Sequence, residues 1–248
     1  MKRWEELPKE MQCNEVRYYY EILRKRRFSL VLKRIFDIVV SLIMIVFFSW
    51  LFLILALAIK IDSPGPVFYR QERITRYGKK FKIHKFRTMV INADREGSLV
   101  TLKDDNRITR VGRILRKCRL DEISQLVDVF MGNMSFVGTR PEVEKYVNSY
   151  SSNMLATLLL PAGITSEASI LYKDEDSFLN NLEDVDRVYI EKILPEKMNY
   201  NLKSIENFNF YNEIKTMGKT TLIIFGKKNP TKKKSENESA KCINRMEN

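Results

Sequence analysis

Two adjacent carboxylates, Asp121 and Glu122, stand between basic residues in this chain of 248 residues. A carboxylate supplies the hard oxygen ligand that Mg²⁺ prefers, and it can also attack phosphorus to give an acyl phosphate. Arginine and lysine side chains neutralise phosphoryl oxygens as charge develops on them. The basic residues on either side of the pair are Lys85, Arg87, Arg116 and Arg140. The pattern indicates phosphate chemistry, and its alternative is an ordinary solvated pair on a helix.

The carboxylate pair is expected at the start of a helix, where the helix dipole keeps a carboxylate ionised. The apolar stripe of this helix consists of Ile123, Leu126, Val127 and Phe130, and Gly132-Asn133 ends it. Just before the pair, residues 107–117 combine four apolar residues on one helical face with five basic ones. That pattern is typical of a helix at a membrane interface, and the alternative is a solvated helix packed on a core.

Other elements predict an α+β fold. Residues 67–71 and 80–86 resemble short strands, and the turn signal at 77–80 between them predicts a β-hairpin. Further helices are expected near 183–194 and 209–217. We therefore expect a small, mostly helical catalytic domain with a short β-hairpin and interfacial amphipathic helices.

The single histidine and the three cysteines restrict the chemistry further. Ser-His or Cys-His catalysis would have to pass through His84, for which packing or surface exposure is the expected role. Cys13, Cys118 and Cys242 lie far apart and form no CxxC pair. We expect neither a disulfide framework nor a structural zinc site, and a reducing compartment fits.

An uncharged run of 22 residues, from Ile38 to Ile59, predicts contact with a membrane. As a helix it would be about 33 Å long, close to the thickness of a bilayer core. Basic residues flank both ends, and such residues remain on the cytoplasmic side. Two topologies agree with these flanks: a re-entrant helix with both ends in the cytoplasm, or a span with a weak orientation signal. We expect the re-entrant form.

The net charge of +12 is concentrated after this run, because residues 70–120 alone carry 16 basic and 5 acidic groups, a net charge of +11. Such a block suits anionic lipid headgroups, phosphate-bearing substrates or RNA. The last residues, 226–248, are polar and basic and are expected to be disordered.

Several ordered motifs between Lys33 and Lys219 resemble the bacterial sugar transferases, or monotopic phosphoglycosyl transferases. They are LKRIFDIVVSL, DSPGPVFYRQERI, FKIHKFRTM, RLDEISQLVDVFMGNMSFVGTRPE and PAGITSEASILYKDED. The resemblance implies transfer of a sugar 1-phosphate from a UDP-sugar to polyprenol (undecaprenyl) phosphate. The products would be UMP and a polyprenyl-diphosphate sugar, the first intermediate of a surface glycan such as exopolysaccharide, capsule or O-antigen.

The resemblance also implies roles for individual residues. Asp121 matches the nucleophile that forms a phosphosugar-aspartyl intermediate and contacts Mg²⁺, and Glu122 matches its partner. Arg116 and Arg140 match residues that hold substrate phosphates, and a motif near the active site contains Lys85 and Arg87. The family's membrane helix is re-entrant, which implies a place on the cytoplasmic face of the bacterial inner membrane, in contact with membrane lipids.

The chain departs from the family pattern at three places. Ser49-Trp50 stands where the family's helix often bends at Ser-Pro, and serine bends a helix less than proline does. Asn133 and Thr139 replace the usual Asp and Pro. Residues 166–169 differ from the Gly-Trp-Ala-Gln of many members, so sugar specificity does not carry over.

These inferences divide the chain into four parts. They are a basic juxtamembrane segment (1–34), a re-entrant membrane helix (35–62), a catalytic sugar transferase domain (63–225) and a basic disordered tail (226–248). The partners expected are a UDP-sugar, polyprenol phosphate and membrane lipids, and no nucleic acid. Two alternatives remain at this point: direct attack with no covalent intermediate, and a non-enzymatic, membrane-anchored basic protein that binds RNA or acidic lipid.

Overall fold

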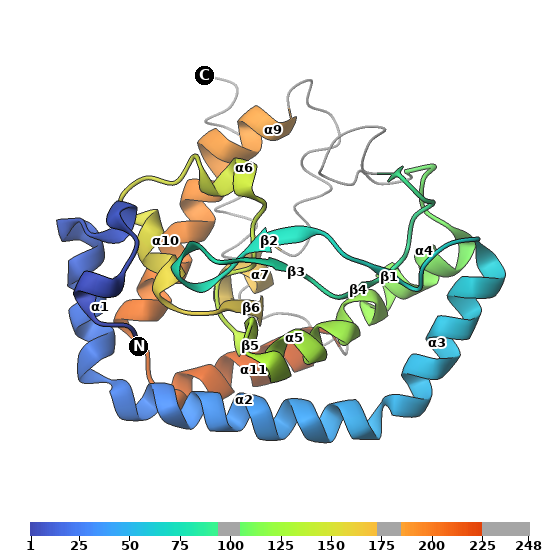
Figure 1. Ribbon diagram of the computed structural model, residues 1–248, viewed down its shortest axis with the longest axis horizontal. Helices are drawn as coiled ribbons and strands as arrows, with labels where there is room; N and C mark the ends of the chain where they lie inside the picture. The colour runs from blue at the N-terminus through green and yellow to red at the C-terminus, as the bar shows by residue number, and fades with distance from the viewer. Residues whose placement is uncertain (94–104, 173–184, 225–248) are drawn as a thin grey trace.

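The computed structural model describes residues 1–93, 105–172 and 185–224. A long helix, α2 (Arg27–Phe47), runs along one side of the molecule and joins α3 (Ser49–Asp62) at a bend of 61° (Figure 1). The bend falls at Phe48, whose φ of −94° and ψ of 10° depart from helical values without a proline. In the described part of the chain, no single helix has the length and hydropathy needed to cross a bilayer. Helices α2 and α3 have the required length and hydropathy only when taken together, as a bent pair.

Helix α2 is amphipathic, and its polar stripe faces the rest of the protein. Lys33, Asp37 and Ser41 are buried, and Lys33 Nζ donates to the carbonyl of Val137 at 2.8 Å and forms an ion pair with Glu213. The helix begins at Arg27, so the expected boundary between residues 34 and 35 falls inside it. Helix α2 is therefore part of the protein core as well as the carrier of an apolar surface.

Arg34 extends this polar stripe to α5 (Leu126–Met131). Its guanidinium donates to the carbonyls of Val129 and Phe130, at 2.7 and 2.8 Å. The last carbonyls of a helix have no partner within the helix, and a cation there also favours the helix dipole. Gly132 then ends α5 in the left-handed conformation, as the sequence predicts.

Three two-stranded sheets give the fold its β component. In the antiparallel sheets, β1 (Phe68–Tyr69) pairs with β4 (Lys85–Phe86), and β2 (Glu72–Ile74) pairs with β3 (Lys80–Lys82). These pairs confirm the expected hairpin, although the strand expected at 80–86 is divided into β3 and β4, and β2 lies just after the strand expected at 67–71. In the third sheet, β5 (Met134–Val137) runs parallel to β6 (Ala162–Thr165). The mixture of helices with short strands confirms the α+β class.

The N-terminal residues are part of the fold. Two short 3-10 turns, Trp4–Glu6 and Lys9–Met11, precede α1 (Asn14–Lys25). Leu7, Met11, Val16, Tyr20 and Leu23 are buried in one cluster with residues of the 3-10 turn η6 (Met154–Leu159) and helix α10 (Leu194–Glu206). The segment expected to be juxtamembrane thus packs against η6 and α10, because α1 carries its own apolar stripe at helical spacing.

The remaining helices are α4 (Arg110–Lys117), α6 (Glu144–Val147), α7 (Glu167–Leu171), α9 (Val185–Val188) and α11 (Phe210–Ile224). Of these, α11 contacts both β5 and β6, whereas α4 lies beside α3 (Figure 1). The helix expected at 183–194 starts outside the described residues and continues from α9 through a π-helical turn, Tyr189–Ile193, into α10. Helix α11 confirms the helix expected at 209–217, and the expected disordered tail lies outside the described residues.

Replacing Leu23 tests whether α1 belongs to the core. Leu23 has no exposed surface, so Leu23→Ala should destabilise the protein by about 2–5 kcal/mol. The shift in Tm of the purified protein in detergent measures this loss. Tyr18→Ala, on the same helix but 57% exposed, is the control and should leave Tm nearly unchanged. Equal Tm values for the two variants would mean that α1 adds little to the core.

Candidate active site

Asp121 and Glu122 lie on a 3-10 turn, η5 (Leu120–Gln125), which leads directly into α5. The sequence predicts a helix start here, and the structure begins that helix with the tighter turn. Arg119, just before it, has a left-handed backbone with φ of 57°. That conformation costs a non-glycine residue about 1–2 kcal/mol. It reverses the chain between α4 and η5 and so brings the carboxylates inward.

Four of the predicted site residues meet at this turn. Lys85 Nζ lies 2.9 Å from Asp121 Oδ2 and 3.6 Å from Glu122 Oε1. Arg140 Nη2 donates to Glu122 Oε1 at 2.8 Å. The two carboxylate side chains are only 4% and 12% exposed. Strand β4 therefore supplies one cation, and the loop after β5 supplies the other. Without these cations, burial would favour the protonated, neutral form of the two carboxylates.

The electrostatics of Glu122 follow from these neighbours. Burial raises the pKa of its carboxyl, but Arg140, Lys85 and Arg119 together outweigh burial and hold the pKa well below its ordinary value. Glu122 is therefore ionised at neutral pH.

Asp121 retains one oxygen that another group can contact. Its Oδ1 is buried and has no hydrogen-bond partner in the described part of the chain. A buried, unpaired carboxylate oxygen fits a divalent cation, and Mg²⁺ binds through one or two carboxylates together with substrate phosphates. No group of three or more possible metal ligands occurs among the described residues. The protein thus fits a Mg²⁺ that would be held by Asp121 and by substrate oxygens.

The other two predicted residues, Arg116 and Arg87, line a cavity of about 500 Å³ beside Lys85. The Arg87 guanidinium is nevertheless directed to the end of α3. It donates to the carbonyls of Pro64 and Ser63, each at 2.7 Å, and to the Ser63 hydroxyl at 2.9 Å. The structure thus places Arg87 as a link between β4 and the end of α3, and its phosphate-binding role stays a prediction.

The contact between His84 and Asp128 was not predicted from the sequence. Asp128 is fully buried on α5, and its carboxylate accepts from the His84 backbone N–H at 2.8 Å and contacts His84 Nδ1 at 2.9 Å. Ser124 donates to the His84 carbonyl. Three contacts therefore fix the backbone just before Lys85. The signal available in the sequence was an Asp placed between apolar residues of the predicted helix.

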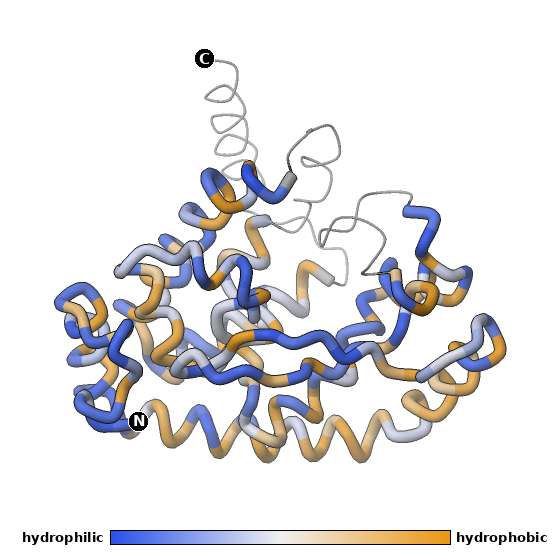
Figure 2. The backbone as a smooth tube through the Cα atoms, turned by 45° about the horizontal axis from the view of Figure 1, so that its top comes forward, coloured by the Kyte–Doolittle hydropathy of each residue, from blue (hydrophilic) through white to orange (hydrophobic). Residues whose placement is uncertain are grey.

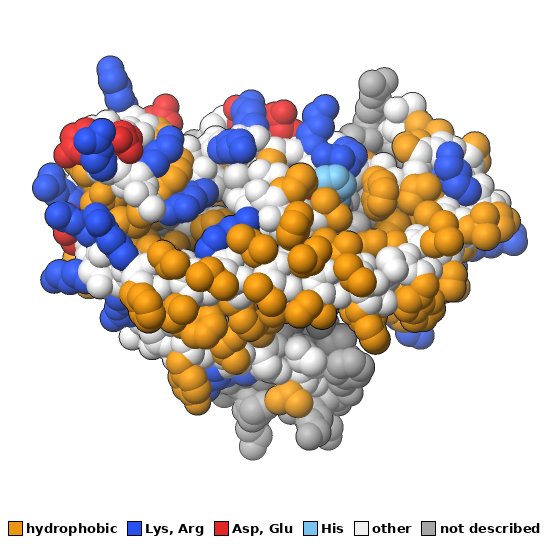
Figure 3. Space-filling model, turned by 60° about the horizontal axis from the view of Figure 1, so that its bottom comes forward, with side chains coloured by type: hydrophobic (Ala, Val, Ile, Leu, Met, Phe, Trp, Pro, Cys, Tyr) orange, Lys and Arg blue, Asp and Glu red, His pale blue; other side chains and the backbone are white. Residues whose placement is uncertain are grey.

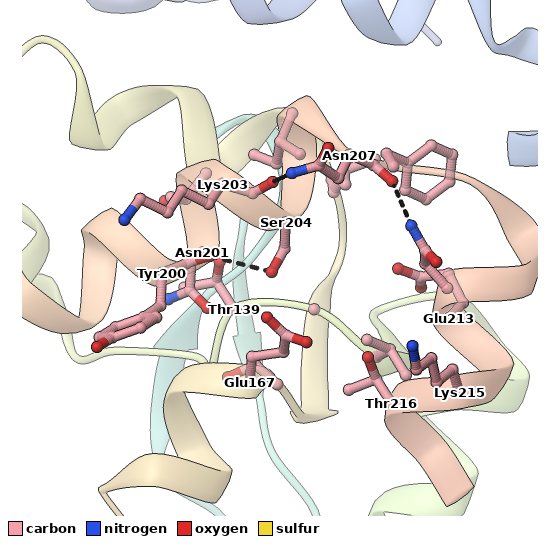
Figure 4. Close-up of a pocket in the computed structure, with 18 of the residues that line it drawn as sticks. Thr139, Glu167, Tyr200, Asn201, Lys203, Ser204, Asn207, Glu213, Lys215 and Thr216 are labelled. Carbon is pink, nitrogen blue, oxygen red and sulfur yellow. Dashed lines mark hydrogen bonds between the residues drawn. The ribbon is translucent and has the colours of Figure 1, made fainter. Parts of the chain in front are cut away.

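A second hollow, of about 400 Å³, lies between α7, α10 and α11. Figure 4 shows Glu167 and Ser204 directed into it, and Ser204 also donates to the carbonyl of Tyr200. None of the predicted site residues is among its described lining residues. Thr139 lines it and precedes Arg140, so this hollow adjoins the loop that carries Arg140.

A continuous apolar surface covers the outer side of α2 and α3. Hydrophobic residues predominate along these two helices (Figure 2). Figure 3 shows hydrophobic side chains as a band across one face of the protein. Val46, Phe47, Trp50, Leu53 and Leu57 are between 58% and 73% exposed. We call these exposed side chains of α2 and α3 the apolar band. Soluble proteins rarely expose so large an apolar patch.

The site, then, is a buried pair of carboxylates neutralised by two cations, in a protein with an exposed apolar helix pair. The bacterial sugar transferase family model matches residues 28–227, and the chain belongs to that family. The match begins just after α1, so the N-terminal segment is packed onto the family's domain but lies outside the match.

Three curated relatives carry names that describe an activity. A UDP-N-acetylgalactosamine-undecaprenyl-phosphate N-acetylgalactosaminephosphotransferase of Aeromonas hydrophila is 41% identical, over 48% of this chain and 28% of the relative. A putative undecaprenyl-phosphate N-acetylgalactosaminyl 1-phosphate transferase of Bacillus subtilis is 39% identical, over 48% of this chain and 69% of the relative. A UDP-glucose:undecaprenyl-phosphate glucose-1-phosphate transferase of Klebsiella pneumoniae is 36% identical, over 65% of this chain and 36% of the relative.

Two close-packed glycines position the loop that carries Arg140, and one substitution tests this. A Cβ on Gly163 would lie 2.1 Å from the Gly138 nitrogen, so Gly163→Ala should separate β5 from β6. We expect a lower Tm and faster hydrogen exchange at the Gly138 N–H, which donates to the Thr165 carbonyl at 2.9 Å. Hydrogen-exchange mass spectrometry of a peptide covering 134–140 measures the second effect.

The control for this variant is Gly218→Ala. Gly218 lies on α11 with no atom within 4 Å of an added Cβ. Alanine there should raise stability by up to about 1 kcal/mol through helix propensity. Wild-type protection of the 134–140 peptide in Gly163→Ala would contradict the role of the glycine contact.

Proposed function

We propose that this chain transfers a sugar 1-phosphate from a UDP-sugar to polyprenol phosphate. One observation carries the proposal. The buried Asp121–Glu122 pair, neutralised by Lys85 and Arg140, occurs in a member of a sugar transferase family. The names of the three relatives support undecaprenyl phosphate as the acceptor, and two of those names support a UDP-sugar as the donor.

The first step of the proposed reaction forms a bond between an Asp121 oxygen and the β-phosphorus of the UDP-sugar. The bond from that phosphorus to the bridging oxygen breaks, and UMP leaves with the electron pair. Lys85, Arg116 and Arg140 are placed to neutralise the phosphoryl oxygens, whose charge grows during transfer. Glu122 stays ionised and keeps Lys85 and Arg140 beside the nucleophile.

In the second step, a phosphate oxygen of the polyprenol phosphate attacks the phosphorus of the phosphosugar on Asp121. The bond between phosphorus and the Asp121 oxygen breaks, which releases the polyprenyl-diphosphate sugar and restores the carboxylate. A covalent intermediate allows two phosphate substrates to use one site in turn.

Mg²⁺ is part of this proposal. Bound to Asp121 Oδ1 and to phosphate oxygens, it would neutralise charge on the donor diphosphate. The support is the buried oxygen of Asp121, which has no hydrogen-bond partner among the described residues.

We also propose that the α2–α3 pair is re-entrant and that the protein sits on the cytoplasmic face of the inner membrane. The apolar band supplies the membrane contact. Leu7, Met11 and Leu23 pack against η6 and α10, so the segment before α2 is joined to the catalytic part that follows α3. This packing supports a topology in which both ends of the helix pair lie on the same side of the membrane. UDP-sugars are cytoplasmic substrates, so we place both ends on the cytoplasmic side of the membrane.

Replacing the nucleophile tests the chemistry. Asp121→Asn is nearly isosteric, but an amide neither attacks phosphorus nor binds Mg²⁺ well, so UMP release and covalent labelling should both disappear. The measurement uses UDP-N-acetylgalactosamine and UDP-glucose, each labelled in the β-phosphate, with undecaprenyl phosphate as acceptor. Asp186→Asn, at an ion pair with Lys145 away from the site, is the control and should keep the wild-type rate.

Two results would oppose the nucleophile role of Asp121. One is retention of more than about a tenth of the wild-type rate in Asp121→Asn, a difference of about 1.4 kcal/mol in barrier. The other is turnover by the wild-type protein with no labelled intermediate, which would favour direct attack.

Cysteine labelling tests the topology. Single reporters replace Glu10 and Asn148, both exposed, in a background without Cys13, Cys118 and Cys242. With an impermeant thiol reagent on intact cells, we expect neither reporter to react, and both to react after permeabilisation. Reaction at residue 10 alone in intact cells would establish a span and overturn the re-entrant form.

A further inference from the structure

The cavity beside Lys85 has walls of two different kinds. Its described lining includes six cationic side chains and no carboxylate: Arg70, Arg73, Lys85, Arg87, Arg107 and Arg116. Seven further lining residues are apolar, and we call them the apolar wall: Pro66, Phe68, Phe86, Met89, Val90, Ile91 and Ala93. A ligand that fits both walls is an amphiphile with an anionic end.

Most of the cations are held by other groups. Arg87 binds carbonyls at the end of α3, Arg107 pairs with Asp105, Arg70 donates to the Lys82 carbonyl and Arg73 to that of Pro141. The Arg116 guanidinium makes no hydrogen bond or ion pair to another described residue. Lys85 is bound to Asp121. An anion in the cavity would therefore be contacted by Arg116 and Lys85, directly beside the nucleophile.

Three residues of the apolar wall are partly exposed, and one of them, Ile91, lies at the end of α3. Phe68, Val90 and Ile91 are 38%, 46% and 52% exposed, although each is a large apolar residue. Ile91 packs on the turn that ends α3, since its Cδ1 lies 2.8 Å from the position of a Cβ on Gly65. Ile61, near the end of α3, is 78% exposed. A chain that follows α3 to its carboxyl end thus meets Ile91 and then the cavity.

We propose that this cavity is the entrance and binding site of the lipid acceptor. The phosphate of the polyprenol phosphate contacts Arg116 and Lys85, and its first isoprene units lie on Phe68, Val90 and Ile91. The base of a nucleotide donor can stack on an aromatic ring, but its ribose and diphosphate are polar and leave the aliphatic Val90 and Ile91 without a partner. This inference rests on the proposed function, and it adds which substrate uses the cavity and which residues bind its chain.

The assignment separates the two half-reactions. Loss of the apolar wall should weaken the second step, in which the lipid phosphate attacks the phosphosugar on Asp121. The first step, release of UMP from the UDP-sugar, uses no lipid and should proceed unchanged.

The experiment uses the full chain in nanodiscs and compares two matched double variants. Val90→Ser with Ile91→Ser removes the exposed apolar wall. Ile43→Ser with Val46→Ser removes the same two residue types from α2, where they are 61% and 67% exposed. Each protein is first labelled from a UDP-sugar carrying label in its β-phosphate, and transfer of that label to undecaprenyl phosphate is then followed over a range of acceptor concentrations.

We expect the cavity variant to form the labelled protein at the wild-type rate and to show an acceptor KM raised about tenfold or more, which is about 1.4 kcal/mol. The α2 variant should raise the acceptor KM much less. The wild-type protein should prefer undecaprenyl phosphate to a two-isoprene phosphate, and the cavity variant should lose part of this preference.

Three results would overturn the assignment: an unchanged acceptor KM in the cavity variant, an equal rise in the α2 variant, or an equal fall in the labelling step. If the double variant does not become labelled at all, the labelling rate and the acceptor KM are measured for Ile91→Ala instead. The same three results would overturn the assignment. Failure of the proposed function is distinct, because the wild-type protein would then neither release UMP nor become labelled.

Discussion

The interaction on which the structure depends is the neutralisation of two adjacent buried carboxylates by Lys85 and Arg140. A carboxylate withdrawn from water without a cation would take up a proton, and it would then be neither a nucleophile nor a metal ligand. The two cations come from segments 55 residues apart in sequence, so both segments must be held accurately. Asp128 and Ser124 fix the backbone before Lys85, and the contact between Gly138 and Gly163 fixes the loop before Arg140.

The same requirement explains why α2 has two different sides. One side exposes large apolar side chains, and the other directs Lys33 and Arg34 to the ends of β5 and α5. The carbonyl that Lys33 contacts belongs to Val137, three residues before Arg140. Arg87 makes the equivalent connection at the end of α3, next to Lys85. The helix pair therefore contacts both segments that supply cations to the carboxylates.

The sequence predicted those features that depend on residue type and local spacing. The α+β class, the hairpin, the end of α5 at Gly132 and helix α11 were all predicted, and Asp121, Glu122, Lys85 and Arg140 do lie together. The position of the bend at Phe48 could not be predicted from the sequence, because Ser49-Trp50 lacks the proline that usually marks such a bend. The stripe of Val16, Tyr20 and Leu23 was present in the sequence, but its basic neighbours favoured a membrane-surface interpretation. The contacts of Arg87 were not predictable, since unpaired carbonyls at Ser63 and Pro64 appear only in three dimensions.

The polar stripe of α2 has a consequence for how the protein can be modified. In a modular tethered enzyme, a membrane anchor can be removed to give a soluble catalytic fragment, or exchanged for an unrelated anchor. Here the buried Lys33, Asp37 and Ser41 belong to the same helix as the apolar band. A chain truncated to begin after α2 would expose the Val137 carbonyl and the Glu213 carboxylate, which Lys33 now contacts, and the Phe136 N–H, which now donates to Asp37. Helix α2 and the part of the chain on which it packs are thus one unit, and a helix transplanted in place of α2 would have to reproduce this stripe residue by residue.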